Sequence, residues 1–356
     1  MRSNQPSTNN SITAPLPICT ILFSIGTPKH QFNVVFDTGS PFLWIASNAC
    51  SHLRCPGMTQ TYDSDDSSTF VDQHNLYSIR YGSGATRGKV GTDTVWFGEL
   101  AVKNQSFGLA SQVSHGVLSP FVHGILGFSP SGGSVGLNKE HKLLATPMEN
   151  LIAQKVIEHN IFSVHFEPIR SADDLEKALG TLTLGELPPK DSYQGDIQWV
   201  PTITSGSLGN FWAVEMNGFR VGDQVFSEEP LKGIVDTGST LIVLPSPMVD
   251  AFYKRIPGAS YDRRLQFWTV PCRSIPSLPT ITFELANGVS LTLTGEQYTA
   301  PEWQVPMWQS RAHVCPVYIV DFHTNAFQFI IGQKLLENYV SIYDADNARV
   351  GFARNA

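Results

Sequence analysis

The sequence predicts a mostly β protein built from two related lobes. Short runs rich in Val, Ile, Thr, Phe and Trp are broken by Gly, Pro, Asn or Asp about every eight to twelve residues, as in "DIQWVPTIT" and "SLTLTGEQY". A second observation is that an apolar run followed by Asp-Thr-Gly-Ser occurs twice. It appears at Asp37 in "VVFDTGSPFLWI" and 199 residues later at Asp236 in "GIVDTGSTLIVL". An internally duplicated β protein explains both observations.

A third repeated motif fits the same duplication. "GILGF" (124–128) and "FIIGQ" (329–333) place Gly127 90 residues beyond Asp37 and Gly332 96 residues beyond Asp236. We expect the boundary near Asp191 to Asp196, after the Pro-rich "ELPPK". The predicted parts are a polar N-terminal extension (1–17), an N-terminal lobe (18–193) and a C-terminal lobe (194–356).

Only a few short helices are expected. "TPMENLIAQKVI" (146–157) begins with a cap-like Thr146 three residues before Glu149, and its apolar residues recur at helical spacing. "SPMVDAFYKRI" (246–256) shows the same pattern. Each predicted helix follows one Asp-Thr-Gly copy, so the two halves correspond in this respect too.

Composition excludes several classes of protein. The chain has 356 residues, of which 42% are hydrophobic and 15% charged, which indicates a packed, soluble chain rather than a disordered one. The net charge of -7 comes without a basic block, so we expect no nucleic-acid partner. No window reaches the roughly 18 consecutive apolar residues of a membrane helix. The first 17 residues lack the apolar centre of a signal peptide, so a secreted form would have lost its leader from this sequence.

The five cysteines suggest a short loop, a long loop and one spare thiol. We predict disulfides Cys50–Cys55 and Cys272–Cys315, which indicate an oxidising compartment. The alternative for "CSHLRC" is half of a zinc site with His52, but no second ligand pair follows at the usual spacing. Asn9 and Asn104 begin Asn-x-Ser sequons that fit the same compartment, although such triplets also arise by chance.

Two other motifs do not support a function. "GGSVG" (132–136) matches the nucleophile elbow of serine hydrolases, but no buried strand precedes it, so we interpret it as a flexible loop. "YGSGATRG" (81–88) has Arg87 where a nucleotide-binding loop needs Gly, and we expect a hairpin there. The ten histidines form no ligand cluster, so neither a metal nor a cofactor is expected.

The paired aspartates point to acid–base chemistry. If the lobes are related by a pseudo-twofold axis, Asp37 and Asp236 meet within hydrogen-bond reach. Repulsion between like charges then makes the pair hold a single proton at acidic pH. The charged member can take a proton from a water that attacks a carbonyl, while the protonated member donates to the carbonyl oxygen, and no covalent intermediate is needed.

From about Cys19 to Arg354, these residues resemble the pepsin-like aspartic proteases, which are bilobal β endopeptidases. The resemblance depends on "FDTGS", "VDTGST", the flap-like hairpin "SIRYGSGATRG", both "GILGF" and "FIIGQ", and the closing "YVSIYDADNARVGFAR". It implies cleavage of polypeptides between apolar residues at acidic pH by a monomer. It also implies a secreted, vacuolar or lysosomal location.

The resemblance also assigns roles to single residues. Asp37 and Asp236 would be the catalytic pair. Three residues on each turn would support them, with threonines locking the turns, glycines allowing close approach and serines donating to the carboxylates: Thr38, Gly39 and Ser40, and Thr237, Gly238 and Ser239. Substrate would contact the flap and an apolar subsite formed by Tyr81, Gly82, Ser83, Val35, Phe121, Ile125 and Thr240. Trp44 would support Tyr81, although core packing alone would also explain Trp44, Val35, Phe121 and Ile125.

The sequence departs from the family in four places. Ser227 and Leu231 stand where pepsin has a third disulfide, and His123 stands where relatives often have Asp. Cys19 lies in the expected first strand, where we favour a buried free thiol over an intermolecular disulfide. No prosegment is visible, so we expect either a mature enzyme or an unusual activation.

Two other functions compete with proteolysis. A catalytically inactive binding protein of the same fold would be expected to lose an Asp, a turn Gly or the flap Tyr, and this chain keeps all of them. A glycoside hydrolase needs its two carboxylates about 5 to 10 Å apart in a groove large enough for a sugar, and the two matching Asp-Thr-Gly turns argue against that arrangement.

Overall fold

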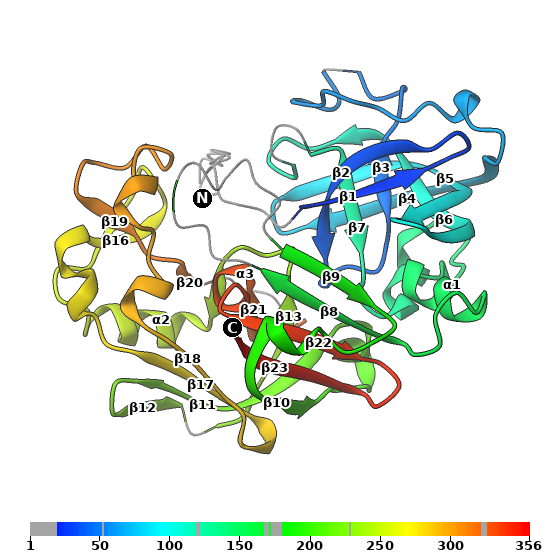
Figure 1. Cartoon of the computed structure of the whole chain (residues 1–356). Coiled ribbons are helices and arrows are strands. Elements are labelled where there is room, and N and C mark those ends of the chain that lie inside the picture. The colour runs from blue at the N-terminus through cyan, green and yellow to red at the C-terminus, as the bar shows by residue number, and fades with distance from the viewer. Residues whose placement is uncertain are drawn as a thin grey trace, which may run out of the picture.

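The computed structural model describes residues 20–51, 53–118, 122–166, 171, 180–227, 229–321 and 326–356. Phe121, Cys19, His52, Asn9 and the predicted extension 1–17 lie outside the described residues. Within this part of the chain the structure is mostly β with a few short helices, and Figure 1 shows two lobes. The predicted mostly β, two-lobed fold is confirmed.

The N-terminal lobe is a seven-stranded sheet with the order β1-β2-β7-β3-β6-β5-β4 and an additional β1–β5 pairing. Its strands are β1 (Thr20–Ile25), β2 (His30–Asp37), β3 (Trp44–Ala46), β4 (Val71–Tyr81), β5 (Gly84–Phe97), β6 (Leu100–Val113) and β7 (Gly124–Gly127). The β4–β5 hairpin is the one expected at "YGSGATRG", with Tyr81 paired to Gly84 across the turn.

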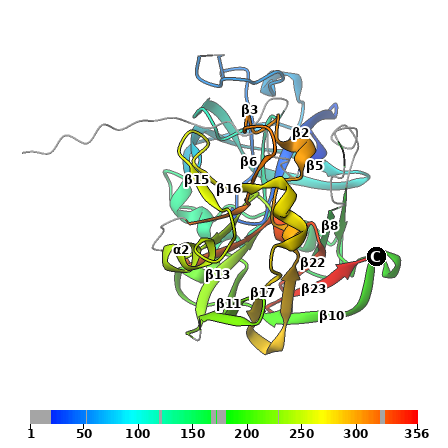
Figure 2. The same ribbon diagram turned by 90° about the vertical axis from the view of Figure 1, so that its left-hand side faces the viewer.

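The C-terminal lobe repeats part of this arrangement in an eight-stranded sheet. Its strands are β11 (Ala213–Val221), β12 (Gln224–Ser227), β13 (Leu231–Asp236), β14 (Ile242–Leu244), β17 (Ile281–Leu285), β18 (Ser290–Leu293), β20 (Ile319–Asp321) and β21 (Phe329–Gly332). The pair β13–β21 is parallel, as β2–β7 is in the other lobe. A small sheet of β15 (Ser260–Asp262), β16 (Phe267–Pro271) and β19 (Val314–Pro316) completes the lobe. Figure 1 shows it at the outer edge of the molecule, and Figure 2, seen from that side, shows β15 and β16 above α2.

A five-stranded sheet draws strands from both halves of the chain, in the order β10-β23-β22-β8-β9. Its strands are β8 (Ile161–Phe166), β9 (Gly180–Leu184), β10 (Tyr193–Pro201), β22 (Tyr339–Asp344) and β23 (Arg349–Asn355). Figure 1 shows this sheet between the two lobes. Because β10 begins at Tyr193, the predicted boundary falls inside this shared sheet, and the division into lobes at 193/194 stays a prediction.

Three α-helices are found in the described residues: α1 (Pro147–Ala153), α2 (Ser246–Tyr253) and α3 (Gln333–Leu336). The first has the expected capping box, in which the Glu149 N–H donates to Thr146 Oγ1 and the Thr146 N–H donates to the Glu149 carboxylate. Both predicted helices are shorter than expected. α1 ends before Lys155, whose φ of +57° leaves the helical region, while Ile157 still packs on the core.

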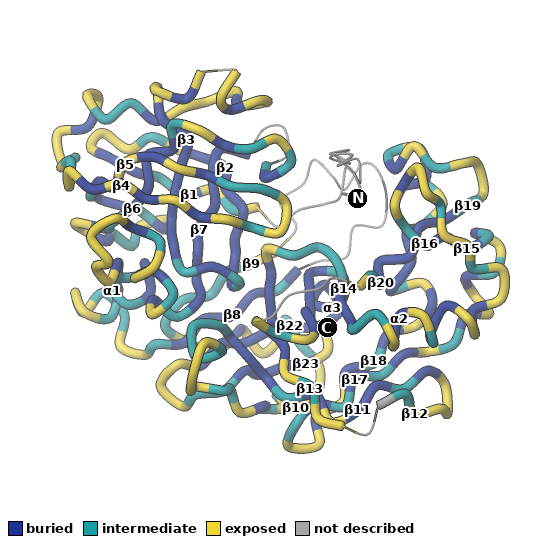
Figure 3. The backbone as a smooth tube through the Cα atoms, turned by 180° about the vertical axis from the view of Figure 1, so that it is seen from behind, coloured by how far each residue is buried: buried dark blue, intermediate teal, exposed yellow. Residues whose placement is uncertain are grey.

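Apolar side chains from all these sheets form one large core. The set includes Phe36, Phe128, Phe162, Trp212 and Tyr343, whose rings contact one another across the two lobes. Figure 3 shows the buried backbone running through the strands of both lobes, with exposed segments at the turns. Burying aromatic rings stabilises a fold strongly because each removes about 150 to 250 Å² from water. The site is therefore supported by a continuous interior.

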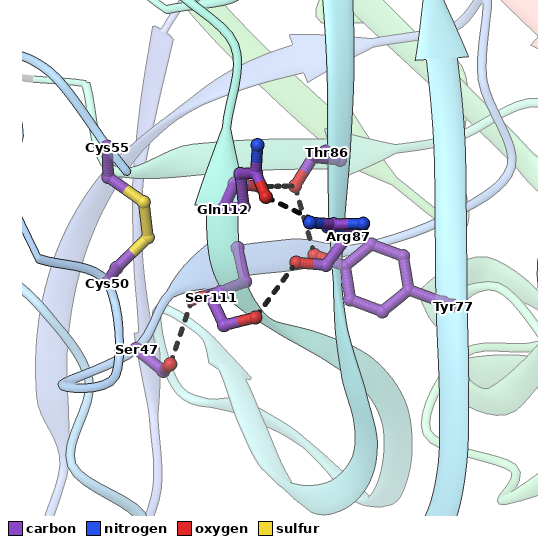
Figure 4. The surroundings of a disulfide bond; sticks show 9 residues. Ser47, Cys50, Cys55, Tyr77, Thr86, Arg87, Ser111 and Gln112 are labelled. Carbon is purple, nitrogen blue, oxygen red and sulfur yellow. Dashed lines mark hydrogen bonds between the residues drawn. A yellow bond between two sulfur atoms is a disulfide. The ribbon is translucent and has the colours of Figure 1, made fainter. Parts of the chain in front are cut away.

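Both predicted disulfides are present, Cys50–Cys55 and Cys272–Cys315. The short loop of the first is fixed beside β6, because the Val113 N–H donates to the Arg54 carbonyl oxygen at 2.9 Å. Figure 4 shows this disulfide close to Ser47, Ser111 and Gln112, near the stem of the β4–β5 hairpin. The second disulfide ties the β16–β19 pair to the chain that follows β16.

The "GGSVG" segment is not the flexible loop we expected. It lies in a 3₁₀ turn, Ser131–Leu137, and Ser134 is fully buried. The Ser134 hydroxyl accepts a hydrogen bond from the Leu144 N–H at 2.8 Å, so this serine holds a turn and is not an exposed nucleophile. Among the described residues, no helix is long and apolar enough to cross a membrane.

Candidate active site

The two Asp-Thr-Gly turns begin at the ends of matching strands. Asp37 ends β2 opposite Gly127 of β7, and Asp236 ends β13 opposite Gly332 of β21. A Cβ on Gly127 would lie 2.6 Å from the Ser40 carbonyl oxygen, so only glycine lets the turn after Asp37 pass this close to β7. Gly332 is under the same constraint from its own turn. The repeated glycine of "GILGF" and "FIIGQ" is thus explained by close packing behind each aspartate.

Two threonines tie the turns together across the lobes. The Thr38 N–H donates to Thr237 Oγ1, and the Thr237 N–H donates to Thr38 Oγ1, both at 3.0 Å. Each hydroxyl in turn donates to a carbonyl oxygen of the opposite lobe, Thr38 to Val235 at 3.0 Å and Thr237 to Phe36 at 2.8 Å. All four bonds are buried. The crossed arrangement fixes the separation and orientation of the two aspartates.

Each carboxylate accepts the same pair of hydrogen bonds from its own turn. In the N-terminal lobe the Gly39 N–H donates to Asp37 Oδ1 at 2.8 Å and the Ser40 hydroxyl donates to Oδ2 at 2.5 Å. In the C-terminal lobe the Gly238 N–H and the Ser239 hydroxyl donate to Asp236 at 2.8 and 2.6 Å. These donors hold each carboxylate in one orientation.

The two carboxylates face each other in a buried site. Asp37 is 6% exposed and Asp236 is 8% exposed. A Cβ on Gly238 would lie 2.6 Å from Asp37 Cγ, and one on Gly39 would lie 2.5 Å from Asp236 Oδ1, so each glycine packs directly on the opposite carboxylate. Burial raises the pKa of Asp37 well above its usual range, and the charge of Asp236 and a hydrogen bond with it raise it further. The hydrogen bonds from Ser40 and Gly39 oppose this rise in pKa.

Tyr81 lies at the tip of the β4–β5 hairpin and reaches toward the first aspartate. Its hydroxyl accepts a hydrogen bond of 2.8 Å from Trp44 Nε1. Burial raises the pKa of Tyr81 well above its usual value, and the charge of Asp37 is the second cause. Gly82 and Ser83 form the exposed two-residue turn that follows it. The structure thus brings the predicted flap tyrosine and its predicted support together beside the dyad.

The predicted subsite residues are only partly assembled. Val35 and Ile125 are paired neighbours in β2 and β7, and they belong to an apolar cluster with Trp44, against which Tyr81 packs. They are 4% and 5% exposed, as core residues would be. Thr240 is partly exposed in the second turn, where its carbonyl oxygen accepts from the Lys334 N–H at 3.0 Å. Phe121 lies outside the described residues.

His123, which departs from the family pattern, has a hydrogen-bonded place behind the first turn. Its Nδ1 accepts from the Asn33 N–H at 3.3 Å, and its Nε2 is 3.2 Å from Thr59 Oγ1. Its ring also meets the edge of the Phe32 ring. Burial lowers the pKa of His123. The bond from the Asn33 N–H requires Nδ1 to be an acceptor, which it is only in the neutral ring, so both features favour neutral His123.

The lowered pKa of His123 predicts a loss of stability in acid. Because its folded pKa lies below the unfolded value of about 6.5, the neutral ring stabilises the fold above that pH, and this contribution is lost as pH falls through the folded pKa. His123→Asn keeps an acceptor and a donor but cannot titrate. We expect the free energy of unfolding of this variant to decline less than that of the wild type between pH 7 and pH 4. The free energies of unfolding are measured by denaturant titration at each pH. An equal decline for the variant and the wild type would contradict the assignment.

One contact beside the site was not expected from the sequence. Trp212, which precedes β11, is buried, and its Nε1 donates to the Phe128 carbonyl oxygen at 2.9 Å, joining the C-terminal lobe to the segment after β7. The Phe128 N–H in turn donates to the Asp37 carbonyl oxygen at 2.7 Å. The sequence around Trp212, "GNFWAVEM", does not indicate this hydrogen bond, because Trp212 and Phe128 are 84 residues apart.

The described residues contain no group of three or more His, Cys, Asp and Glu side chains that could hold a metal ion. The arrangement instead offers two coupled carboxylates, each oriented by two donors. Such a pair can take a proton from water and give one to a carbonyl oxygen.

Comparison with known proteins agrees with this geometry. The family model described as eukaryotic aspartyl protease matches residues 20–355. Gastricsin from Cavia porcellus is 32% identical over 343 residues, covering 94% of this chain and 79% of its own. Cathepsin D from Chionodraco hamatus is 33% identical over 336 residues, covering 93% and 79%.

Two further matches concern location and fold. Vacuolar protease A from Arthroderma otae is 30% identical over 334 residues, covering 93% of this chain and 76% of its own. The crystal structure of an aspartic proteinase from Irpex lacteus superposes with a TM-score of 0.82 at 27% identity, covering 95% and 94%. Together with the two disulfides, the relatives support the expected class of location, which is secreted, vacuolar or lysosomal.

Proposed function

The chain belongs to the eukaryotic aspartyl protease family and is an aspartic endopeptidase, and we propose that Asp37 and Asp236 hydrolyse peptide bonds by activating a water molecule between them. The observation that carries this proposal is the mutual packing of the two turns, in which each glycine lies against the opposite carboxylate. The raised pKa of Asp37 follows from that packing and lets the pair keep one proton in acid.

In the proposed step the dyad acts as one unit. Its charged carboxylate takes a proton from water, whose oxygen attacks the peptide carbonyl carbon, while its protonated carboxyl donates to the carbonyl oxygen. The resulting tetrahedral intermediate collapses when the C–N bond breaks: the carboxyl that took the proton from water gives it to the leaving nitrogen, and the other carboxylate takes back a proton from a hydroxyl of the intermediate, which restores the one-proton dyad. The Ser40 and Ser239 hydroxyls keep the carboxylates aimed throughout. No side chain of the enzyme becomes covalently attached to the substrate.

We propose that Tyr81 and its hairpin cover the bound peptide. Two observations support this role: the Tyr81 hydroxyl accepts a hydrogen bond from Trp44 Nε1, and Tyr81 lies close enough to Asp37 for the charge of Asp37 to raise the pKa of Tyr81, after the larger effect of burial. The apolar cluster around Val35, Trp44 and Ile125 supports a preference for apolar side chains next to the cleaved bond. Polypeptide substrates, acidic pH and a monomeric enzyme complete the proposal.

A lid role predicts that Tyr81→Ala lowers kcat/KM on a peptide long enough to reach the hairpin by about tenfold, or about 1.4 kcal/mol. The reason is that water exclusion and positioning are lost while the dyad stays intact. Tyr81→Phe is the matched control, since it removes only the acceptor of the Trp44 hydrogen bond and should have the smaller effect. Unchanged kinetics for Tyr81→Ala would contradict the lid.

The proposed activity is tested by incubating the purified protein with an unfolded protein at several acidic pH values and sequencing the products. Cleavage between apolar residues supports both activity and preference, and cleavage elsewhere contradicts the preference alone. An inactive binding protein would give no products. A glycoside hydrolase is disfavoured because its carboxylates stand about 5 to 10 Å apart around a bound sugar, whereas here the glycine of each turn packs directly on the opposite carboxylate.

A further inference from the structure

Asn104, the first residue of the Asn-Gln-Ser triplet, lies at an irregularity of the β5–β6 pair. Asp93 pairs with Gln105 and Val95 pairs with Val102, so the single residue Thr94 stands opposite two residues of β6. This two-against-one count is a β-bulge. Asn104 has a φ of +52°, a left-handed conformation that Asn tolerates better than most residues. The bulge explains how this side chain leaves the regular strand.

The residues on either side of Asn104 are fixed to the chain around α1. The Lys103 N–H donates to Gln154 Oε1 at 3.0 Å, and Gln154 Nε2 donates to the Lys103 carbonyl oxygen at 2.8 Å. Gln105 is buried, and its side chain donates to the Ala145 carbonyl oxygen at 2.9 Å and accepts from Asn150 at 2.8 Å. Asn104 itself is exposed. Its amide group therefore projects into solvent from a rigid base.

We propose that Asn104 is an N-glycosylation site of this protein. The sequon supplies Ser106 two residues after Asn104, as the transfer requires, and the two disulfides indicate the oxidising secretory route in which it happens. The donor is an oligosaccharide linked to a lipid through pyrophosphate. The bond between its anomeric carbon and the phosphate oxygen breaks, and a bond from that carbon to Asn104 Nδ2 forms. The lipid pyrophosphate is the leaving group, and Nδ2 loses one proton. No oxidant or reductant is involved.

The folded protein accommodates this modification without disturbing the dyad. Asn104 lies opposite Thr94, ten residues along β5 from Gly84 at the flap turn. At roughly 3.3 Å per residue, this corresponds to about 30 Å along the strand. The glycan would stand beside the end of α1, which Figure 1 shows on the outer side of the N-terminal lobe. We therefore expect occupancy at Asn104 to leave kcat/KM unchanged.

The test uses the full chain secreted from a eukaryotic host and carrying Asn9→Gln, which removes the other sequon. The protein is treated with peptide N-glycosidase F in ¹⁸O-labelled water and mapped by peptide mass spectrometry. We expect ¹⁸O-labelled aspartate at position 104, and also in Ser106→Thr, which keeps the sequon. Ser106→Ala, which keeps Asn104 but breaks the sequon, should give unlabelled asparagine and the same kcat/KM. Unmodified Asn104 throughout the secreted, disulfide-bonded Asn9→Gln protein would overturn the proposal, whether or not either Ser106 variant folds.

Discussion

Replacing Asp37 or Asp236 by Asn is expected to lower kcat/KM for peptide hydrolysis by at least about 100-fold, the lower end of what general acid–base catalysis contributes. Each replacement preserves the shape of the side chain but removes one member of the pair that takes and gives the proton. Near-normal activity in either variant would contradict the dyad.

A second measurement on Asp37→Asn separates chemistry from folding. Because the folded pKa of Asp37 is raised, its contribution to stability is fully present below the unfolded pKa of about 3.9 and is lost as pH rises through the folded pKa. Asn cannot titrate, so the variant should lose less stability than the wild type between acidic and neutral pH. Asp93→Asn is the matched control, since Asp93 is a buried carboxylate that accepts from the Tyr62 and Thr69 hydroxyls outside the dyad. The Asp93→Asn variant should have a lower free energy of unfolding than the wild type and an unchanged kcat/KM.

Gly39→Ala and Gly238→Ala are expected to lower kcat/KM by about 100-fold, comparable to the effect of displacing a reacting group by about 1 Å. The added methyl group would lie within 2.6 Å of the opposite carboxylate, and that carboxylate must move because the turns are fixed by the threonine bonds. Overpacking of this kind also costs about 1 to 3 kcal/mol of stability.

Gly136→Ala is the matched control for these substitutions. A Cβ there meets nothing within 4 Å, and the residue is exposed, so both activity and stability should be unchanged. Steady-state kinetics with thermal unfolding would check all three variants. Full activity in Gly39→Ala or Gly238→Ala would mean that the turns are farther apart than the structure has them.

Local patterns in the sequence predicted what depends on neighbouring residues. The Thr146 capping box, the β4–β5 hairpin at "YGSGATRG" and the short Cys50–Cys55 disulfide are all found in the structure. The predicted Cys272–Cys315 disulfide is found too, although its cysteines are 43 residues apart, because the number of cysteines leaves few possible pairings. The crossed threonine bonds, which the resemblance to the pepsin-like proteases implied, are also found. Helix ends were predicted less well, since Val156 and Ile157 continue the apolar pattern past the end of α1.

Pairings between distant segments could not be predicted. The five-stranded sheet joins β8 to β22, with the Ser341 hydroxyl bonded to the Val164 carbonyl oxygen 177 residues away. Hydrophobic periodicity marks a strand but not its partner. The same limit applies to Trp212 and to the short helix α3, whose four residues are too few to show a period. The interpretation of "GGSVG" as a flexible loop was wrong because the order and burial of a Gly-rich turn depend on what packs over it.

The central claim is that Asp37 and Asp236 work as a pair that shares one proton, and the pH dependence of kcat/KM tests it most directly. Below the lower apparent pKa of the pair both carboxyls are protonated and no base remains, and above the upper one both are charged and no acid remains. The profile is therefore predicted to be bell-shaped with its maximum on the acid side of neutrality, measured where parallel unfolding experiments show the protein to be folded. A reversible maximum at or above neutral pH, with the fold intact on both sides, would contradict the shared-proton dyad.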